Sequence, residues 1–234
     1  MIKLYSAATP NGHKVHIMLE ELGLPYEANR VRIGQGEQFK PSFLKISPNN
    51  KIPAIIDTDG PGGKPISVFE TGAILFYLGE KTGKFLPKRT RERMEVMQWL
   101  MFQMGGIGPM LGQAHHFRHY APKKIPYAFD RYTNEAARLY GVMDRQLKKS
   151  KFIANDKYSI ADMACYPWIA MHARQGQDMK DFRHVKRWLE TVGARPAVKR
   201  GMQVLVTGPE PERPKFSATA RDVLFGKTQY QRRK

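Results

Sequence analysis

The sequence has almost no cysteine, because Cys165 is the single one among 234 residues. One cysteine excludes an internal disulfide, a Cys-x-x-Cys redox pair and a thiolate-cluster metal site. The opening apolar stretch, residues 1–8, is short and carries Lys3, which is not typical of a secretory signal. These absences predict a cytoplasmic protein kept under reducing conditions.

Long hydrophobic runs are also lacking. Residues 96–117 form a stretch of 22 residues without a formal charge, but four glycines, a proline and several glutamines and histidines interrupt it. A membrane-spanning helix does not readily tolerate that composition, so we expect no membrane association. Met94, Met97, Met101 and Met104 recur at helical spacing, which predicts packing in the core or at a subunit interface.

Acidic residues are outnumbered, with 21 Asp and Glu against 39 Lys and Arg and a formal net charge of +18. Residues 1–85 hold ten basic and eight acidic residues, whereas residues 86–200 hold 22 and ten. Such an excess can follow a phosphate backbone or attract small anions. The sequence has no recognised nucleic-acid motif, and its aromatic residues are not interleaved with the basic ones as a base-stacking platform requires. We therefore expect no nucleic-acid partner.

Two hydrophobic periodicities divide the chain. The first part alternates strand and helix patterns in the order strand, helix, strand, helix, strand, strand, helix, with a glycine-rich turn at residues 59–63. After Pro87 the patterns are helical, and residues 159–162 fit a helix capping box. We predict an α/β domain over residues 1–86, an all-helical domain over residues 89–205 and a basic tail over residues 206–234, extended and packed only in part.

Three loops of the α/β domain place polar groups where a ligand could bind. Thr9 and Asn11 precede the first helix, at the end of a strand, which is a favoured ligand position in such domains. Thr9 acting only as a helix cap explains this loop equally well. In the third loop, Glu70 and Thr71 lie at a helix start, where they could hold an ammonium and a carboxylate group or simply cap the helix.

The second loop leads into a strand through Lys51, Ile52 and Pro53. A cis bond before Pro53 would turn the backbone amide and carbonyl of Ile52 outward, ready to pair with an extended peptide. An ordinary loop is the alternative, because only about 5–6% of X–Pro bonds are cis.

Taken in this order, the three loops resemble those of the glutathione transferase family. The resemblance covers roughly residues 1–205 and implies a thioredoxin-like N-terminal domain followed by an all-α domain. Ile52-Pro53 matches the cis-proline element that pairs with the cysteinyl backbone of glutathione, and Glu70-Thr71 matches the pair that holds its γ-glutamyl end. Residues 9–14, 47–53 and 105–113 look like the bacterial nu-class members, which are known for glutathione-dependent disulfide-bond reductase activity and some peroxidase activity.

The resemblance implies that Thr9 and Asn11 are the catalytic residues nearest the glutathione sulfur. Thr9 and Gly12 stand where thioredoxin-like proteins carry their two cysteines, so the chain has no catalytic thiol of its own. Cys165 is flanked by apolar residues and is expected to be buried and inert. Any thiol–disulfide exchange must then use glutathione as a co-substrate. Tyr5 offers a competing hydroxyl, but its place inside a strand favours packing.

Further site residues follow from the same resemblance. We assign Gln38 and Lys51 to the glycyl end of glutathione, and Arg131 resembles a helical-domain arginine that reaches the ligand. A solvated charge on a helix face explains Arg131 equally well. The predicted glutathione-binding residues are therefore Thr9, Asn11, Gln38, Lys51, Ile52, Pro53, Glu70, Thr71 and Arg131.

Other interpretations stay open at this point. A glutathione thiolate attacks carbon as well as sulfur, so conjugation to electrophiles is an alternative, and a non-catalytic glutathione-binding or protein-interaction module is another. His115, His116 and His119 lie close together without a nearby carboxylate, so we expect no metal. The expected partners are glutathione, a small disulfide or electrophile, and a second subunit packed on residues 94–104. The sequence leaves open the physiological substrate and whether one or two glutathiones bind.

Overall fold

A mixed four-stranded sheet organises the first part of the chain. The computed structural model describes residues 1–208 and 216–231. The strand order is β2-β1-β3-β4, in which β1 and β2 are parallel and the other neighbours are antiparallel. The strands are β1 (Ile2–Ser6), β2 (Tyr26–Arg30), β3 (Ala54–Asp57) and β4 (Ile66–Phe69). The predicted crossover between the first two strands and the predicted hairpin are both confirmed.

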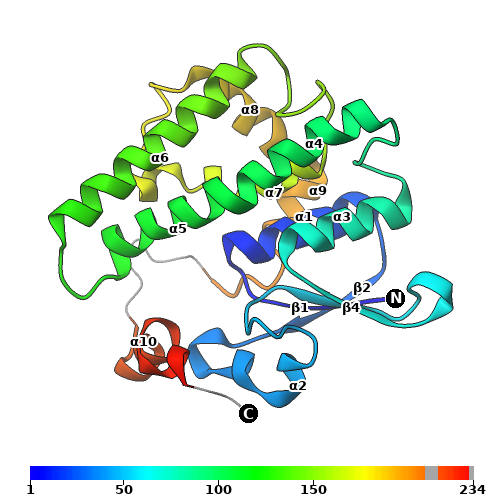
Figure 1. Ribbon diagram of the computed structural model, residues 1–234, viewed down its shortest axis with the longest axis horizontal. Helices are drawn as coiled ribbons and strands as arrows, with labels where there is room; N and C mark the ends of the chain where they lie inside the picture. Colours follow the sequence, from blue (N-terminus) through cyan, green and yellow to red (C-terminus); the bar gives the residue numbers. More distant parts are fainter. Residues whose placement is uncertain (209–215, 232–234) are drawn as a thin grey trace.

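Two helices cover one face of the sheet and separate it from the helical part of the chain (Figure 1). These are α1 (Pro10–Leu22) and α3 (Thr71–Thr82), whereas α2 (Pro41–Leu44) lies on the other side (Figure 1). Short 3₁₀ turns connect the elements: η1 (Ile33–Gln35), η2 (Glu37–Phe39) and η3 (Pro61–Gly63). The side chains of β1 alternate, so Leu4 and Ser6 are fully buried whereas Tyr5 is only half-buried.

The second part is all-helical, as the sequence predicts. Helical backbone continues from α4 (Thr90–Phe102) through η4 (Gln103–Ile107) and α5 (Gly108–His115) to η5 (His116–Tyr120). Both η4 and η5 are π-helical turns, and η4 immediately precedes a segment that contains Pro109, which cannot donate a helical hydrogen bond. The remaining helices are α6 (Pro126–Leu147), α7 (Ile160–Ile169), η6 (His172–Gln175), α8 (Arg183–Gly193) and α9 (Pro196–Gly201).

The predicted capping box begins α7. The Ser159 side chain accepts a hydrogen bond from the Ala161 backbone, and Asp162 Oδ2 accepts one from the Ser159 backbone at 2.9 Å. Asp162 also accepts from Trp188 Nε1 at 2.8 Å. Burial raises the pKa of Asp162 to about 6, while these hydrogen bonds favour the ionised form. The box fixes the helix that runs through the centre of the fold.

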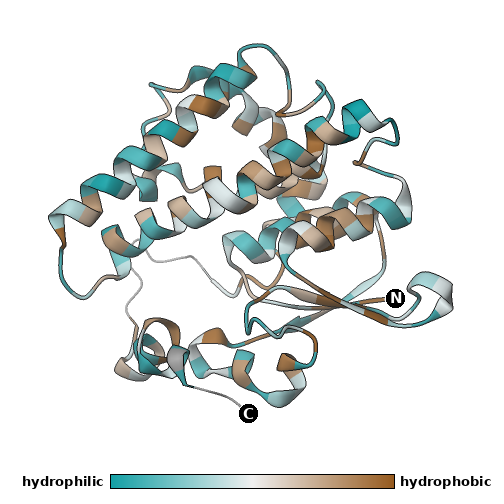
Figure 2. Ribbon diagram, in the orientation of Figure 1, coloured by the Kyte–Doolittle hydropathy of each residue, from teal (hydrophilic) through white to brown (hydrophobic). Residues whose placement is uncertain are grey.

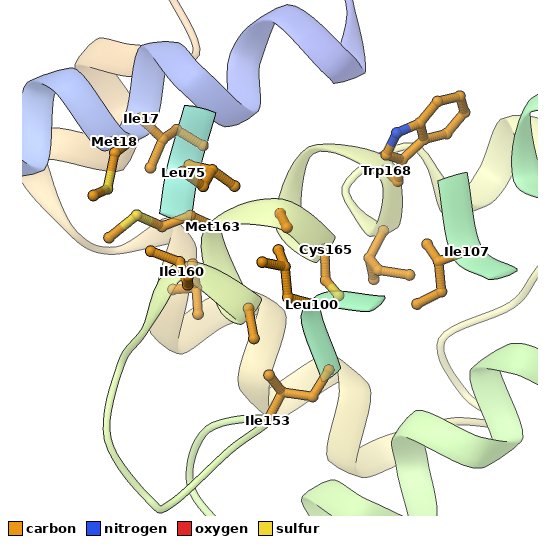
Figure 3. Packing of buried hydrophobic residues seen from close by; sticks show 14 of the residues in the cluster. Ile17, Met18, Leu75, Leu100, Ile107, Ile153, Ile160, Met163, Cys165 and Trp168 are labelled. Atoms are coloured by element: carbon orange, nitrogen blue, oxygen red, sulfur yellow. The ribbon is translucent and has the colours of Figure 1, made fainter. Parts of the chain in front are cut away.

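One continuous hydrophobic core joins the two parts. Ile17 and Met18 of α1 lie near Met163 of α7 in Figure 3, and apolar residues concentrate along α3 and the strands beneath it in Figure 2. Helix α9 approaches α1 so closely that a Cβ at Gly201 would lie 2.7 Å from the Ile17 Cα. The position of α1 therefore depends on the helical part as well as on the sheet.

The C-terminal segment corrects the expectation of an extended tail. Residues 218–225 form helix α10 (Ala218–Phe225), followed by the 3₁₀ turn η7 (Lys227–Tyr230), and α10 packs against η1 of the first domain. Ser217 caps α10 by accepting from the Ala220 backbone at 3.1 Å. The rest of the predicted tail, residues 209–215 and 232–234, lies outside the described residues.

Within the described ranges, no helix has both the length and the apolar character needed to cross a lipid bilayer. The methionine stripe predicted on α4 divides by environment. Met94 and Met101 are about half exposed, at 48% and 52%, whereas Met97 packs on the core and Met104 faces the cleft described below.

Candidate active site

A cleft of about 630 Å³ lies where the first domain, the helical domain and the C-terminal segment meet. This volume is in the range of small-molecule sites. The cleft brings together eight of the nine residues predicted to bind glutathione: Thr9, Asn11, Gln38, Lys51, Ile52, Pro53, Glu70 and Thr71. The three loops singled out in the sequence therefore share one wall.

Thr9 is the N-cap of α1, as the simpler interpretation of this loop expected. Its Oγ1 accepts a hydrogen bond from the Gly12 backbone at 3.1 Å. A threonine hydroxyl that accepts in this way still has its own proton to donate, and Thr9 lines the cleft. Gly12 is required here, because a Cβ would lie 2.1 Å from the Ala7 carbonyl oxygen. Capping and ligand binding are thus compatible roles.

Asn11 follows in the first turn of the same helix and also lines the cleft. Its Oδ1 accepts a hydrogen bond from Trp168 Nε1 at 3.0 Å, across 157 positions of sequence. Trp168 belongs to the helical domain and was not among the predicted site residues. No local motif marks it, because its partner is brought to it only by the packing of α1 on α7.

The peptide bond between Ile52 and Pro53 is cis, as the sequence suggested, and both residues line the cleft. Ser47 Oγ donates to the Lys51 carbonyl at 2.8 Å and so ties this loop to α2's end. Lys51 Nζ donates to Gln229 Oε1 of the C-terminal segment at 3.3 Å. The predicted lysine thus lies at the junction of the loop and η7.

Glu70 and Thr71 stand at the start of α3. Glu70 has a φ of +66°, a value that residues other than glycine rarely adopt, and its Oε1 accepts from Asn49 Nδ2 at 3.2 Å. Thr71 is 7% exposed, and its Oγ1 donates to Met104 Sδ at 3.3 Å. The carboxylate of Glu70 and the amino end of α3 therefore face the same cleft.

A buried lysine beneath the cleft was missed by the sequence analysis. Lys14 is 2% exposed, and its Nζ donates to Gln103 Oε1 at 2.8 Å and to Thr71 Oγ1 at 3.3 Å. Burial lowers the pKa of Lys14 to about 7, although the negative charge of Glu70 opposes this shift. The available signal was a lysine on the buried face of α1, between the core residues of that helix.

Gln38 is 3% exposed in the cleft wall, although glutamine is rarely buried so completely. Its Nε2 donates to the Ile33 carbonyl at 3.0 Å. Its Oε1 is buried and has no hydrogen-bond partner among the described residues. A ligand N–H in the cleft could satisfy this oxygen.

The opposite wall comes from the helical domain and the C-terminal segment. The helical domain contributes Gln103 and Met104 of η4 and Gln113 of α5. The C-terminal segment contributes Leu224, Phe225 and Gln229. A second hollow continues from the cleft past His116 and Tyr120. Phe225 stacks on Tyr120 with ring centroids 5.5 Å apart and also meets Phe216, which anchors α10 at this edge.

Two predicted or competing groups lie elsewhere. Arg131 is exposed on α6 and is not among the cleft-lining residues, so its role in ligand binding stays a prediction. Tyr5 lines a separate hollow with Phe43 and Ile46, on the α2 side of the sheet. Its hydroxyl is therefore not a competitor for Asn11 in the cleft.

The histidines of the helical domain pack among aromatic residues. His115 is 4% exposed and lies against Trp168, with ring centroids 5.5 Å apart. Burial, with the nearby charges of Arg174, His119 and Arg118, lowers the pKa of His115 to about 3. In the described part of the chain, no three or more His, Cys, Asp or Glu residues are grouped to hold a metal ion.

Cys165 is fully buried in the core and is not among the cleft-lining residues. Figure 3 shows its side chain beside Leu100, within the cluster that joins α1, α3 and α7. Burial raises the pKa of the Cys165 thiol well above its ordinary value, so the thiolate is not formed at neutral pH. The prediction that this cysteine is buried and inert agrees with both observations.

Comparison with protein families gives two matches along the chain. The model for the glutathione S-transferase N-terminal domain matches residues 1–80, and that for the C-terminal domain matches residues 110–196. The disulfide-bond oxidoreductase YfcG of Escherichia coli strain K12 is 52% identical over 211 residues, covering 90% of this chain and 98% of that protein. The disulfide-bond oxidoreductase YghU of the same strain is 50% identical over 215 residues, covering 86% of this chain and 73% of that protein.

Solved structures show the same likeness. A glutathione transferase family member from Pseudomonas fluorescens, with two glutathione bound, gives a TM-score of 0.82 at 50% identity and covers 86% of this chain and 92% of its own. A glutathione transferase from Pseudomonas putida, with one glutathione disulfide bound per subunit, gives 0.83 at 48% identity and covers 87% and 91%. The family models, the sequence identity and the shared fold lead to one conclusion: the chain belongs to the glutathione S-transferase family.

Proposed function

We propose that the protein is a glutathione-dependent disulfide-bond reductase that uses glutathione as its co-substrate. The observation that carries the proposal is the contrast between the cleft and the thiol. The cleft gathers polar side chains and two helix N-termini, whereas Cys165 is sealed in the core. The names of the two E. coli relatives support the same activity.

The reaction needs two glutathione thiols. The first thiolate attacks one sulfur of the substrate disulfide, so that a mixed disulfide forms and one substrate thiolate leaves and takes up a proton. A second glutathione thiolate attacks the glutathione sulfur of the mixed disulfide and releases the second substrate thiol with glutathione disulfide. One substrate disulfide is reduced to two thiols while two glutathiones are oxidised. The Pseudomonas structures, with two glutathione or one glutathione disulfide bound, support a cleft that holds both partners.

We assign the thiolate to the amino end of α1. The Thr9 hydroxyl and the Asn11 amide would donate hydrogen bonds to the sulfur, and the helix N-terminus favours its negative charge. Donors of this kind lower the pKa of the bound thiol and so raise the fraction of nucleophile at neutral pH. The protein thereby activates the thiol of its co-substrate, glutathione, and not a thiol of its own chain.

The remaining groups would hold the two ends of glutathione. Glu70 binds the ammonium and Thr71, at the start of α3, binds the γ-glutamyl carboxylate, with the Lys14 ammonium 3.3 Å from the Thr71 hydroxyl. The Ile52 backbone pairs with the cysteinyl unit. Lys51 and Gln38 take the glycyl end.

Turnover with glutathione as the sole reductant tests the proposal. We expect the purified protein to reduce 2-hydroxyethyl disulfide, and calorimetry to detect binding of glutathione or glutathione disulfide. Absence of binding for both forms would contradict the proposal and the site together. An organic hydroperoxide should also be turned over, because the same thiolate can attack a peroxide oxygen. We expect this turnover to be slower than that of the disulfide.

Conjugation to electrophiles is the second candidate, because a thiolate in this cleft can attack carbon as well as sulfur. A chloronitrobenzene in place of the disulfide discriminates the two reactions. Faster turnover of the electrophile than of the disulfide would favour conjugation. Binding of glutathione without turnover of either would favour a non-catalytic binding module.

We also infer a homodimer that forms in the cytoplasm. Met94 and Met101 leave apolar surface exposed on α4, beside a hollow that Trp99 lines, and family membership supports a second copy there. Met94→Glu with Met101→Glu should shift the protein to monomer in sedimentation velocity. Tyr127→Glu is the matched control, since Tyr127 is 77% exposed on α6.

The single cysteine suits a reducing compartment that maintains glutathione, which supports the cytoplasm as the location.

A further inference from the structure

The orientation of the Asn11 side chain is fixed by a residue of the other domain. An indole N–H can only donate, so the Asn11 atom 3.0 Å from Trp168 Nε1 must be the carbonyl oxygen, Oδ1. The amide nitrogen then points away from the indole. No acceptor among the described residues takes a hydrogen bond from that nitrogen, and Asn11 lines the cleft. Two N–H donors are therefore available to a ligand.

Trp168 is itself held by a buried chain of hydrogen bonds. Its carbonyl accepts from Gln175 Nε2 at 2.7 Å, and Gln175 Oε1 accepts from the Tyr140 hydroxyl at 2.7 Å. Gln175 and Tyr140 are both fully buried. The indole ring lies against His115, and a Cβ on Gly112 would come within 3.4 Å of it. The donor that meets Asn11 thus has little freedom to move.

We propose that Trp168 is a positioning residue, which turns the amide N–H groups of Asn11 toward the sulfur of bound glutathione. The inference rests on the proposed function. Without the indole N–H, the amide can rotate, and its oxygen would then face the thiolate for part of the time. An oxygen facing a thiolate repels it, whereas an N–H group stabilises it. Through this contact the helical domain sets the electrostatics of a helix in the first domain.

The variant Trp168→Phe removes the N–H donor and keeps most of the ring. We expect kcat for disulfide reduction to fall about tenfold, the size of one lost hydrogen bond. The pKa of the bound glutathione thiol, measured from thiolate absorbance against pH, should rise by about one unit. The KM for glutathione should stay within about twofold, because Trp168 supports an amide that meets the sulfur only. Tyr127→Phe, at an exposed position of α6 that does not line the cleft, is the matched control and should change neither quantity.

A double-mutant cycle separates positioning from general support of the fold. In the Asn11→Ala background, Trp168→Phe should cause no further loss of kcat, because there is no amide left to orient. An equal tenfold loss in both backgrounds would overturn the proposal. So would an unchanged thiol pKa in Trp168→Phe.

A measurement on the unaltered indole covers the case in which Trp168→Phe does not fold. The Trp168 Nε1 proton should exchange with solvent at least tenfold faster in Asn11→Ala than in the wild type, as measured by NMR. Equal exchange rates would overturn the hydrogen bond and with it the proposal. Failure of the wild type to bind glutathione would instead reject the proposed function. If the wild type binds glutathione but Trp168→Phe leaves the thiol pKa unchanged, this inference alone is rejected.

Discussion

The two sides of the cleft are built differently. On the side of the first domain, Thr9, Asn11 and Thr71 present polar groups from loops and helix starts, where a ligand can reach them. On the helical side, two polar groups reach across to the first: Gln103 Oε1 accepts from Lys14 and Trp168 Nε1 donates to Asn11, while Gln103 Nε2 is buried without a partner among the described residues. The first side is suited to touch glutathione, and the second is suited to hold the first in place.

The difference teaches where large and small effects should lie. Under the proposed function, substitutions on the first side would remove contacts with glutathione, so they should change turnover or affinity strongly. Substitutions on the second side act through another residue or through the shape of the cleft. Five variants, from the largest expected effect to the smallest, can break or sharpen this division.

The largest effect is expected for Asn11→Ala. Loss of a donor to the thiolate should lower kcat on the order of 10²-fold, as for a lost oxyanion donor. Steady-state disulfide reduction with saturating glutathione measures it. Tyr5→Phe, on the α2 side of the sheet, should leave kcat unchanged. A larger loss of kcat for Tyr5→Phe than for Asn11→Ala would contradict the catalytic role proposed for Asn11.

Glu70→Gln tests affinity on the same side. Loss of a charged partner for the glutathione ammonium should weaken binding about tenfold or more, with a smaller change in kcat. Calorimetric titration with glutathione gives the value. Glu190→Gln is the control, because Glu190 is exposed on α8 and is not among the cleft-lining residues. Equal affinities for the wild type and Glu70→Gln would refute the assignment of the γ-glutamyl end.

Lys14 links the two sides, and its pKa gives a pH prediction. Since the folded-state pKa is about 7 and the ordinary value is 10.5, the unfolded state binds more protons between these values. The free energy of unfolding therefore rises with pH in that window, by at most about 1.4 kcal/mol per pH unit, and below pH 7 it carries the full penalty of charging the buried lysine.

The variant Lys14→Met lacks this titration, so the wild type should gain stability relative to it from pH 7 to pH 10. Urea denaturation at several pH values measures the difference. A constant difference across this range would mean that Lys14 keeps its charge, held by Glu70 and the bound oxygens of Thr71 and Gln103.

Phe225→Ala tests the C-terminal side. Loss of an aromatic wall should raise the KM for an aromatic disulfide about three- to tenfold while glutathione affinity changes little. Phe216→Ala is the control, because Phe216 contacts Phe225 and Tyr120 but does not line the cleft. A matching change in glutathione affinity would show that the two sides are not separable.

Cys165→Ala should have the smallest effect on activity, with kcat within about twofold of the wild type. Removing a buried sulfur leaves a small cavity, so a lower melting temperature is expected. Parallel assays of turnover and thermal unfolding separate the two. Lost turnover in a folded variant would contradict the proposal that glutathione supplies both thiols.

Sequence patterns predicted one side of the cleft far better than the other. The helix cap at Thr9, the Ile52-Pro53 step and the Glu70-Thr71 start are short-range features, and each was found from its neighbours in sequence. Trp168 and Gln103 act on partners more than 80 positions away, so only packing reveals them.

The C-terminal segment shows the same limit. Its prolines and scattered charges predict an extended chain, yet α10 forms where Ser217 caps it and where Phe225 stacks on Tyr120. The tertiary contact with Tyr120, added to the local cap at Ser217, explains that helix. Lys14 was missed because helical periodicity identifies the buried face of α1 but not the partners of a charged side chain on that face.

The sealed cysteine has a thermodynamic consequence. A chain whose only thiol is buried in its core has no reduction potential of its own and stores no electrons between turnovers. The extent of substrate reduction would then be set by the potentials of the glutathione couple and the substrate, with the protein affecting only the rate. Nor would the proposed catalytic groups be open to over-oxidation to sulfinic or sulfonic acid, because hydroxyl and amide groups do not enter that series.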